Sequence, residues 1–325
     1  MKKVSIVIPV YNEAAYIEAC LDSVVGFERE GLALEVLVVD GGSRDGTRET
    51  IEAYARRYGY IKLLDNPDRI VPKAMNIGIA EATGEYIVRL DAHAIYPKDY
   101  VQKLVTYAQR LHADNVGGVV RTEVRRLTPV SCAVRNVLAD KLGVGSAFRT
   151  GVSDIREVDT VPFGCYRKEI FSQIGLYDER LARNQDIELN KRLKRHGGRI
   201  VLVPDIVCTY FARETYAALM RNGFQNGRWN MLTAFYTGTL RSLSVRHYMP
   251  MLFVMTLLVS AICCVEVSLG LFLVYLSIIL WRSCRIARQT TCPHQVAAFL
   301  ALHFSYGAGE LWGAAEAAVR ALKKE

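Results

Sequence analysis

Continuous apolar runs alternate with amphipathic stretches at the start of the chain. The runs are rich in β-branched residues, which is typical of strands buried on both faces of a parallel sheet. They cover residues 4–10, 34–39, 61–64 and 86–90. The stretches between them carry apolar residues at helical spacing and cover residues 14–25, 48–58 and 72–82. Asn12 is the expected N-cap of the first stretch. Strand alternating with helix predicts right-handed βαβ units, and so an α/β fold with a mostly parallel sheet flanked by helices.

The alternation becomes less regular after residue 100. We expect strands at residues 116–120 and 158–166, a short helix at residues 169–174, and a longer helix around Leu189 that ends at Gly197. Residues 121–157 are basic and contain Ser and Gly, and we expect a mobile loop there.

The segment "MPMLFVMTLLVSAICCVEVSLGLFLVYLSIIL" is almost purely apolar. As one helix it would measure about 48 Å, against a bilayer hydrocarbon core near 30 Å. Glu266 lies at its middle, where a charge is costly. The alternatives are a hairpin that turns near Glu266 and one strongly tilted helix. The positive-inside rule favours the hairpin, because it keeps three following arginines cytosolic. These are Arg282, Arg285 and Arg288.

The last part of the chain, residues 296–319, is less apolar and contains His303, Glu310 and Glu316. It is either a third span or a helix in the membrane plane, and the terminal "RALKKE" favours the latter. A buried helical hairpin of a soluble protein is the alternative for the whole region. We therefore predict a cytosolic domain over residues 1–245 and membrane-anchoring helices over residues 246–325.

Composition narrows the class of protein. The chain has 325 residues, 51% of them hydrophobic and 23% charged, which excludes a disordered or collagen-like protein. A net charge of +8 would suit nucleic acid, but no nucleic-acid-binding motif is present, and anionic lipid explains the charge as well. The 8 cysteines form no CxxC or zinc-type spacing and are expected to be reduced. "MKKVSIVIPVYNE" does not resemble a signal peptide, so a cytoplasmic domain is expected.

Polar residues follow the predicted strands at the edge where parallel sheets bind ligands. Asp40 ends the second strand, and Asp91 and His93 follow the fourth. "DGGSRDGT" is not the G-x-G-x-x-G of a nicotinamide-binding domain and follows the wrong strand for it. A carboxylate such as Asp40 can instead accept hydrogen bonds from ribose hydroxyls or from the N–H of uracil.

Four motifs in order carry a resemblance over roughly residues 3–230. They are "VSIVIPVYNE", "VLVVDGGSRDGT", "NIGIAEATGEYIVRLDAH" and "NQDIEL…RL…GG". Together they resemble the family 2 glycosyltransferases, inverting enzymes with the GT-A fold. The forms "DGGS", "LDAHA" and "HFSYGAGELWG" are similar to the succinoglycan-type glucosyltransferases within that family.

The resemblance implies a nucleotide-sugar site at the strand ends. Pro9, Tyr11 and Glu13 match the first nucleotide-contacting loop, and Asp40 matches the acid that binds the uridine. The family usually has a second Asp after it, where this chain has Gly41, so one polar contact is expected to be absent.

Asp91 matches the first acid of the family's D-x-D motif, and His93 replaces the last. The resemblance implies that they hold a divalent ion, Mn²⁺ or Mg²⁺, which neutralises the leaving diphosphate. Imidazole favours Mn²⁺ over Mg²⁺. His93 could instead touch a phosphate oxygen, or be a polar strand end satisfied by a backbone carbonyl.

Asp186 matches the Asp of the family's "ED" pair, the proposed general base, while Gln185 stands where Glu is usual. An inverting transfer needs one carboxylate to take the proton of the acceptor hydroxyl. The alternative is an acid that complements the dipole at a helix start.

"QNGRW" fits the Q-x-x-R-W signature of polysaccharide synthases. By that resemblance Gln225, Arg228 and Trp229 contact the acceptor or the diphosphate, with Arg228 on the diphosphate and Trp229 stacked on a sugar. The alternative is an interfacial amphipathic helix.

We therefore expect a plasma-membrane glycosyltransferase with a cytoplasmic catalytic domain. Its donor would be a UDP-sugar, with glucose favoured, and its acceptor a polyprenyl-diphosphate-linked saccharide in exopolysaccharide or related glycan assembly. Membrane lipid is an expected partner and nucleic acid is not. A processive polysaccharide synthase and a non-catalytic membrane scaffold with the same fold are the alternatives.

Overall fold

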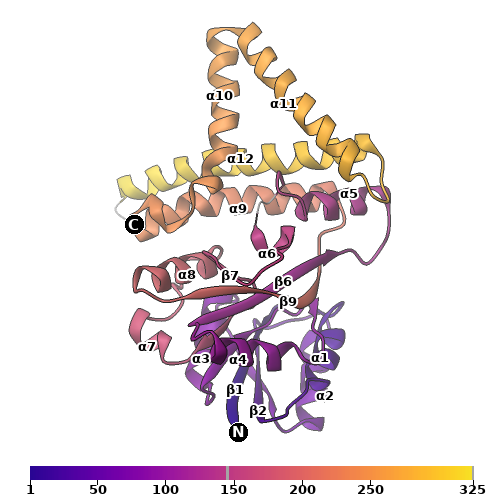
Figure 1. Cartoon of the computed structure of the whole chain (residues 1–325). Helices are drawn as coiled ribbons and strands as arrows, with labels where there is room; N and C mark the ends of the chain where they lie inside the picture. The colour runs from indigo at the N-terminus through magenta and orange to yellow at the C-terminus, as the bar shows by residue number, and fades with distance from the viewer. Residues whose placement is uncertain (144–145, 324–325) are drawn as a thin grey trace. The chain divides into compact units, whose positions relative to one another are not determined.

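The computed structural model describes residues 1–143 and 146–323, and its chain forms two compact units (Figure 1). The sheet unit comprises Met1–Arg121 and Gly151–Tyr210. The helical unit comprises Thr122–Thr150 and Phe211–Glu325. Residues 144–145 of the expected loop and residues 324–325 of the terminal basic run lie outside the described residues. The expected boundary near residue 245, between a catalytic and a membrane-anchoring part, stays a prediction. The two compact units divide the chain at other positions, after residues 121, 150 and 210.

The sheet unit is built on one mixed sheet. Its main path runs in the order β3-β2-β1-β4-β8-β6-β9-β5, and β7 pairs with β9. The strands are β1 (Lys2–Val10), β2 (Leu32–Asp40), β3 (Ile61–Asp65), β4 (Tyr86–Arg89), β5 (Ala94–Ile95), β6 (Asn115–Glu123), β7 (Arg156–Glu157), β8 (Cys165–Arg167) and β9 (Ile200–Phe211). The first four are mutually parallel, whereas β8 runs antiparallel to β4 and to β6. The predicted α/β fold, with a largely parallel sheet in its first half, is confirmed.

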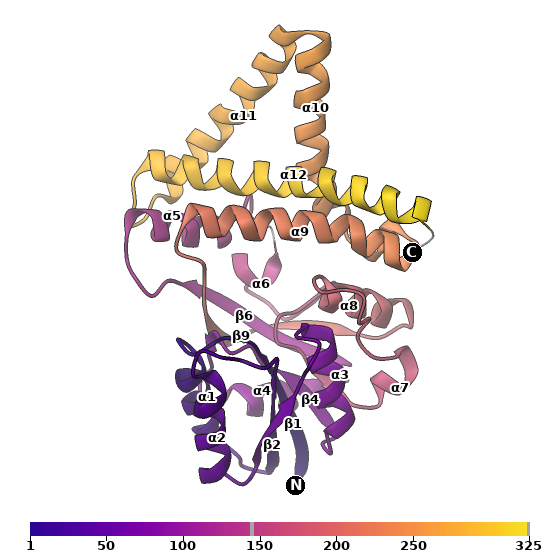
Figure 2. The ribbon, with the colours of Figure 1, turned by 180° about the vertical axis from the view of Figure 1, so that it is seen from behind.

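Helices cover this sheet on both faces. They are α1 (Ile17–Val25), α2 (Thr47–Arg57), α3 (Val71–Glu81), α4 (Tyr100–Arg110), α7 (Ile170–Ile174) and α8 (Gln185–Arg195). The connections from β1 to β2 and from β2 to β3 move in the same direction across the sheet. The connection from β3 to β4 moves in the opposite direction, to the other side of β1. Right-handed crossovers therefore put α1 and α2 on one face and α3 on the other. Figure 2 shows them on opposite sides of β1 and β2.

Strand register brings the site residues to one edge. Val10 pairs with Asp40, and Asp40 pairs with Asp65, so β1, β2 and β3 end level with one another. β4 is paired with β1 up to Arg89, and Asp91 follows two residues later. The edge is therefore lined by whatever polar residues end these strands, as expected for ligand sites in such sheets.

Two local predictions in this unit are wrong. Asn12 does not cap α1, which begins after Tyr16; Asn12 has a positive φ of 53° and its side chain accepts a hydrogen bond from the Arg44 amide. Residues 158–166 do not form one strand, because only the short β8 is extended there. Pro162 offers no amide hydrogen and Phe163 has a φ of 46°, so a continuous ladder cannot form.

The helical unit contains residues 122–150, which are most of the segment expected to be a mobile loop. Its elements are α5 (Pro129–Leu138), α6 (Ala147–Thr150), α9 (Tyr216–Thr237), η1 (Leu240–Ser242), η2 (Val245–Tyr248), α10 (Met249–Cys263), α11 (Val265–Ile286) and α12 (Cys292–Lys323). The mobile-loop prediction for residues 121–157 is therefore wrong. Thr128 and Ser131 form a capping box that starts α5, and Ala133, Val134 and Val137 pack into the apolar core of the unit.

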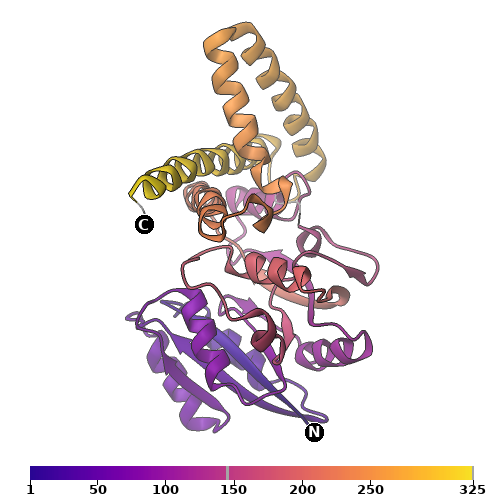
Figure 3. The same ribbon diagram turned by 90° about the vertical axis from the view of Figure 1, so that its left-hand side faces the viewer.

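The apolar segment forms a hairpin of two helices, α10 and α11, which meet at Cys264 (Figure 3). The extended backbone of Cys264, with φ −161° and ψ 99°, breaks the segment just before Glu266. Both Val245–Cys263 and Val265–Ile286 are long and apolar enough to cross a membrane, and only 6% and 11% of their apolar windows are buried. A core helix of a soluble protein would be mostly buried, so these exposed helices do not match the buried-hairpin alternative, and the break at Cys264 contradicts a single helix.

The third helical segment, α12, lies along α9 (Figures 1 and 2). Glycines let the two backbones approach closely. A Cβ on Gly227 of α9 would lie 2.1 Å from the Tyr306 carbonyl oxygen, and one on Gly309 of α12 would lie 2.0 Å from that of Phe224. Gly223 and Gly313 extend the contact along both helices. Among the described helices, only α10 and α11 pass as candidate spans, so a third span is not supported.

Candidate active site

Asp40 is the most enclosed carboxylate at the strand edge. It is 0% exposed, and its Oδ1 accepts hydrogen bonds from the Ser43 amide at 3.1 Å and the Ser43 hydroxyl at 2.6 Å. Arg48 Nη1 lies 3.3 Å from Oδ2 and 2.6 Å from Asp65 Oδ1. The glycine-rich turn after β2 therefore folds back onto Asp40, and these hydrogen bonds fix the orientation of its carboxylate.

The loop after β1 packs beside this turn. Pro9 is the penultimate residue of β1 and pairs with Val39, while Tyr11 is 44% exposed. A Cβ on Gly41 would lie 3.0 Å from Tyr11 Cδ2, and the Arg69 guanidinium lies 5.9 Å from the centre of the Tyr11 ring. Gly41, the departure from the family pattern, therefore leaves room for an aromatic ring that an aspartate at this position would crowd.

Glu13 connects this loop to His93. The Glu13 amide donates to Thr47 Oγ1 at 2.8 Å, and Glu13 Oε1 lies 3.4 Å from His93 Nδ1. His93 Nε2 lies 3.0 Å from the Tyr210 hydroxyl. Burial lowers the pKa of His93, but the hydrogen bond to Glu13 and the nearby acidic groups outweigh it and raise the pKa to about 10. Both ring nitrogens of His93 have side-chain partners. The alternative in which His93 is a polar strand end bonded only to a backbone carbonyl is therefore not supported.

Asp91 is held by a cation that sequence reasoning missed. Arg89, the last residue of β4, donates from Nε and Nη2 to Asp91 Oδ1 at 3.2 and 3.1 Å. Burial alone would lower the pKa of Arg89; the charges of Asp91 and Asp186 act against it, and the net shift is upward. Arg89 is therefore the shared electrostatic partner of the expected metal ligand and the expected base. A lone arginine inside the apolar run "YIVRL" was the available signal.

Asp186 lies in the first turn of α8, where the helix dipole favours a negative charge. Its Oδ1 accepts a hydrogen bond from the Ile187 amide at 2.9 Å. The residue before α8, Asn184, has a φ of 60° and sets the direction in which the helix starts. Gln185, in the place of the family's Glu, is 6% exposed and turns away from solvent. Its neighbour Asp186 is less buried than Gln185.

Asp91 and His93 could supply only part of the coordination of a divalent ion, and the rest would come from a bound nucleotide-sugar and water. Among the residues that the structure describes, no three His, Cys, Asp or Glu side chains form a group that could hold a metal ion. Asp91 and His93 are 18% and 26% exposed at their side chains, so both can be reached from solvent. A carboxylate with one nitrogen ligand, completed by diphosphate oxygens and water, would be a normal partial site for Mg²⁺ or Mn²⁺. His93 could serve in it only after losing its proton and one of its contacts with Glu13 and Tyr210.

The "QNGRW" residues lie on α9, in the helical unit. Arg228 forms a two-pronged ion pair with Glu316 of α12, with Nε–Oε2 at 2.6 Å and Nη2–Oε1 at 2.8 Å. Gln225 Oε1 lies 3.5 Å from Arg228 Nη1, and the Arg228 guanidinium lies 5.8 Å from the centre of the Trp229 ring. In this structure the motif contributes to the α9–α12 contact.

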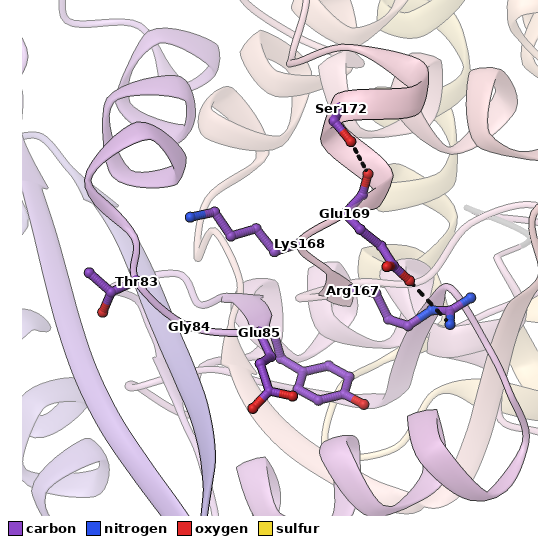
Figure 4. A pocket seen from close by; sticks show the side chains of 8 residues that line it. Thr83, Gly84, Glu85, Arg167, Lys168, Glu169 and Ser172 are labelled. Carbon is purple, nitrogen blue, oxygen red and sulfur yellow. Dashed lines mark hydrogen bonds and ion pairs between the residues drawn. The ribbon is translucent and has the colours of Figure 1, made fainter.

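A surface pocket of 610 Å³ lies elsewhere on the sheet unit (Figure 4). It is lined by residues next to Tyr86 and Arg167, which pair at the amino end of β4, so it opens at the edge opposite Asp91. Its charged side chains are engaged with the protein: Glu85 pairs with Lys2, and Lys168 donates to the Ala82 carbonyl. We do not assign the active site to it.

Comparison with known proteins agrees with this geometry. The model of the family "Glycosyl transferase family 2" matches residues 5–129. The succinoglycan biosynthesis protein ExoA of Rhizobium meliloti (strain 1021) is 36% identical over 226 residues, which are 69% of this chain and 67% of that protein. A dolichyl N-acetyl-α-D-glucosaminyl phosphate 3-β-D-2,3-diacetamido-2,3-dideoxy-β-D-glucuronosyltransferase of Methanococcus voltae is 25% identical, over 81% of this chain and 87% of its own.

Solved structures support the fold. The mannosyltransferase PcManGT from Pyrobaculum calidifontis, in complex with GDP-Man and Mn²⁺, aligns with a TM-score of 0.64 and 19% identity, over 96% of this chain and 87% of its own. With a sheet whose strand ends carry acids matching the family's motifs, and a relative of this identity and coverage, the chain belongs to glycosyl transferase family 2.

Proposed function

We propose that the protein is an inverting glycosyltransferase that moves a sugar, glucose in the first instance, from a UDP-sugar to a lipid-linked saccharide. The observation that carries the proposal is the position of one partly buried cation, Arg89, which donates two hydrogen bonds to Asp91 and also feels the charge of Asp186. It links the residue expected on the donor's diphosphate to the residue expected on the acceptor. A scaffold would have no need for this juxtaposition.

The donor would bind along the strand edge. Asp40 would accept hydrogen bonds from the uridine once Ser43 or Arg48 gives up its contact with the buried carboxylate, and the exposed ring of Tyr11 would cover the base. Pro9 and Glu13 shape the same loop. Asp91, with His93, would hold Mn²⁺ or Mg²⁺. When bound, that ion would neutralise the negative charge that develops on the leaving diphosphate. The Mn²⁺ in the solved mannosyltransferase and in the structure described as GalNAc-T7 with UDP, GalNAc and Mn²⁺ supports a divalent ion of this kind.

Asp186 would act on the acceptor. As the attacking hydroxyl bonds to the anomeric carbon, its proton passes to the Asp186 carboxylate, and the configuration at that carbon inverts. The helix dipole of α8 and the positive charge of Arg89 both favour a negative charge at this position. Arg89 also holds Asp91 through two hydrogen bonds.

The proposed class of acceptor follows from the apolar hairpin of the helical unit. The exposed hairpin α10–α11 would cross the plasma membrane, with the catalytic domain in the cytoplasm and α12 along the membrane plane. A catalytic unit tied to a bilayer suits a substrate carried by a polyprenyl diphosphate, and the succinoglycan and dolichyl phosphate names of the relatives support exopolysaccharide or related glycan assembly. Gln225 and Trp229 remain predicted acceptor contacts; Arg228 would have to exchange Glu316 for a diphosphate.

A processive synthase is the rival enzyme, since a relative at 23% identity is the poly-β-1,6-N-acetyl-D-glucosamine synthase of Staphylococcus aureus. Only two candidate spans were found in the described residues, which disfavours an enclosed channel in one chain. A screen of nucleotide sugars by UDP release, with a defined lipid-linked primer, decides between them. One added sugar supports the proposal, a ladder of products supports the synthase, and no metal-dependent release with any donor supports the scaffold.

A further inference from the structure

Two cysteines at the base of the hairpin lie closer than two free thiols can rest. Cys284 is on the last turn of α11 and Cys292 is the first residue of α12, and their Sγ atoms are 2.7 Å apart. Non-bonded carbon atoms rest at roughly 3.5–4.0 Å, and sulfur is larger. A disulfide has its sulfurs at about 2.05 Å, so this pair is nearer to the bonded than to the non-bonded distance.

The hydrogen bonds of α5 hold this geometry without any covalent link. Asn136 donates from Nδ2 to the carbonyl oxygens of Ile286 and Arg288, at 3.1 and 3.0 Å. Thr290 Oγ1 donates to the Pro129 carbonyl at 2.6 Å. The connection between α11 and α12 is therefore fastened at several points, and the two sulfurs are brought together by the fold of the helical unit.

Both sulfurs can also be reached by a small reagent. Cys284 is exposed and Cys292 is partly exposed, whereas Cys20, Cys132, Cys165 and Cys208 are buried. The hydrogen bond with Cys284 raises the pKa of the Cys292 thiol to about 11, which keeps Cys292 protonated at neutral pH.

We propose that Cys284 and Cys292 are a redox-active pair that forms a reversible intramolecular disulfide under hydroperoxide. The Cys284 thiolate attacks the peroxide O–O bond, which gives a sulfenic acid and, for hydrogen peroxide, one water. Cys292 then attacks the sulfenic sulfur, the S–S bond forms, and a second water leaves. Two thiols and one peroxide thus become one disulfide and two waters. The expected cytosolic position of this end of the hairpin favours a reversible bond over a permanent one.

The bond would tie the end of one candidate membrane helix to the start of α12. Because α12 packs along α9, the oxidised chain would have its hairpin clamped at the base. This inference concerns the helical unit alone and holds whether or not the proposed transfer reaction is correct.

The test uses the full chain in detergent or in native membranes. The protein is treated with hydrogen peroxide, remaining thiols are blocked with N-ethylmaleimide, and its peptides are mapped by mass spectrometry. We expect the peptides containing Cys284 and Cys292 to be linked, lighter by two hydrogen atoms than the reduced pair, and separated again by dithiothreitol. Cys284→Ser and Cys292→Ser should each abolish the link, and the oxidised wild type should melt at a higher temperature than the reduced one.

Cys263 and Cys264 provide an internal control, because both are exposed at the other end of the hairpin. We expect them to remain available to the maleimide under mild peroxide. If these two oxidise first while Cys284 and Cys292 are both still alkylated, the pair is not redox-active. Linkage between two chains in place of linkage within one would also overturn the proposal.

Discussion

Replacing Gly309 by alanine puts a methyl group where the backbone of α9 lies. Its Cβ would be 2.0 Å from the Phe224 carbonyl oxygen, and contacts below 3.0 Å are essentially never observed. A backbone atom cannot move aside by changing rotamer, so α9 and α12 must separate by about 1 Å at this point. The separation would loosen the neighbouring contact at Gly227 and the Arg228–Glu316 ion pair.

The expected cost follows from two opposing effects. Overpacking a tight contact costs about 1–3 kcal/mol, and occasionally more. Alanine returns at most about 1 kcal/mol through its higher helix propensity. Because the 2.0 Å approach is to a backbone atom, the overpacking cost belongs at the upper end of its range, and the net cost is about 1–2 kcal/mol. At about 2–4 °C lost per kcal/mol in a unit of this size, the melting temperature of Gly309→Ala should fall by roughly 2–8 °C.

Two matched variants make the measurement specific. A Cβ on Gly270 of α11 has nothing within 4 Å, so Gly270→Ala should melt with the wild type or slightly above it. A Cβ on Gly223 would lie too close only to the Ser305 hydroxyl, at 2.5 Å, which can rotate away, while its distances of 3.5 and 3.6 Å to Leu302 are ordinary contacts; Gly223→Ala should therefore fall between the two. Thermal melting of the full chain in one detergent gives the order. If Gly309→Ala melts no lower than Gly270→Ala, the close crossing of α9 and α12 is wrong.

Four further predictions concern ionisable groups. Asp186→Asn should lower turnover by about 10²–10⁴ while calorimetric donor binding is kept, and wild-type turnover would remove its role as base. Asp91→Ala should lose both metal and donor affinity. His93→Asp should keep activity and shift the metal preference toward Mg²⁺. If the ratio of the rates with Mn²⁺ and Mg²⁺ is unchanged in His93→Asp, His93 does not bind the metal. Arg89→Lys should retain more turnover than Arg89→Gln, because only the lysine keeps a cation that can hold Asp91 in place; equal losses would contradict this. Burial raises the pKa of Glu310 from 4.5 to about 7, so the folded chain holds a proton that the unfolded chain releases near pH 4.5. Thermal stability should therefore fall as pH rises from about 4.5 to 7, and an equally steep fall in Glu310→Gln would show that another group is responsible.

The sequence by itself was sufficient for the order of elements in the sheet unit and for the edge that carries the acids. Buried strands, amphipathic helices and turn residues are local patterns, and each is written within a few consecutive residues. The carboxyl ends of parallel strands lie at the same edge of a sheet, so Asp40 and Asp91 could be assigned to one edge from the sequence alone. The apolar hairpin and its break near Glu266 were readable for the same reason.

Only the tertiary structure decided which residues meet across long separations. The charge of Asp186 acts on Arg89, nearly a hundred residues away in the sequence, and Arg228 binds Glu316 on another helix. The helix α5, which we predicted to be a loop, is stabilised by an apolar core that also contains residues of α9, α11 and α12. Nothing in the basic sequence around α5 indicates that these helices pack against it. The Cys284–Cys292 approach likewise depends on hydrogen bonds from α5. Such contacts depend on the packing of whole elements against one another, which no local pattern in the chain records.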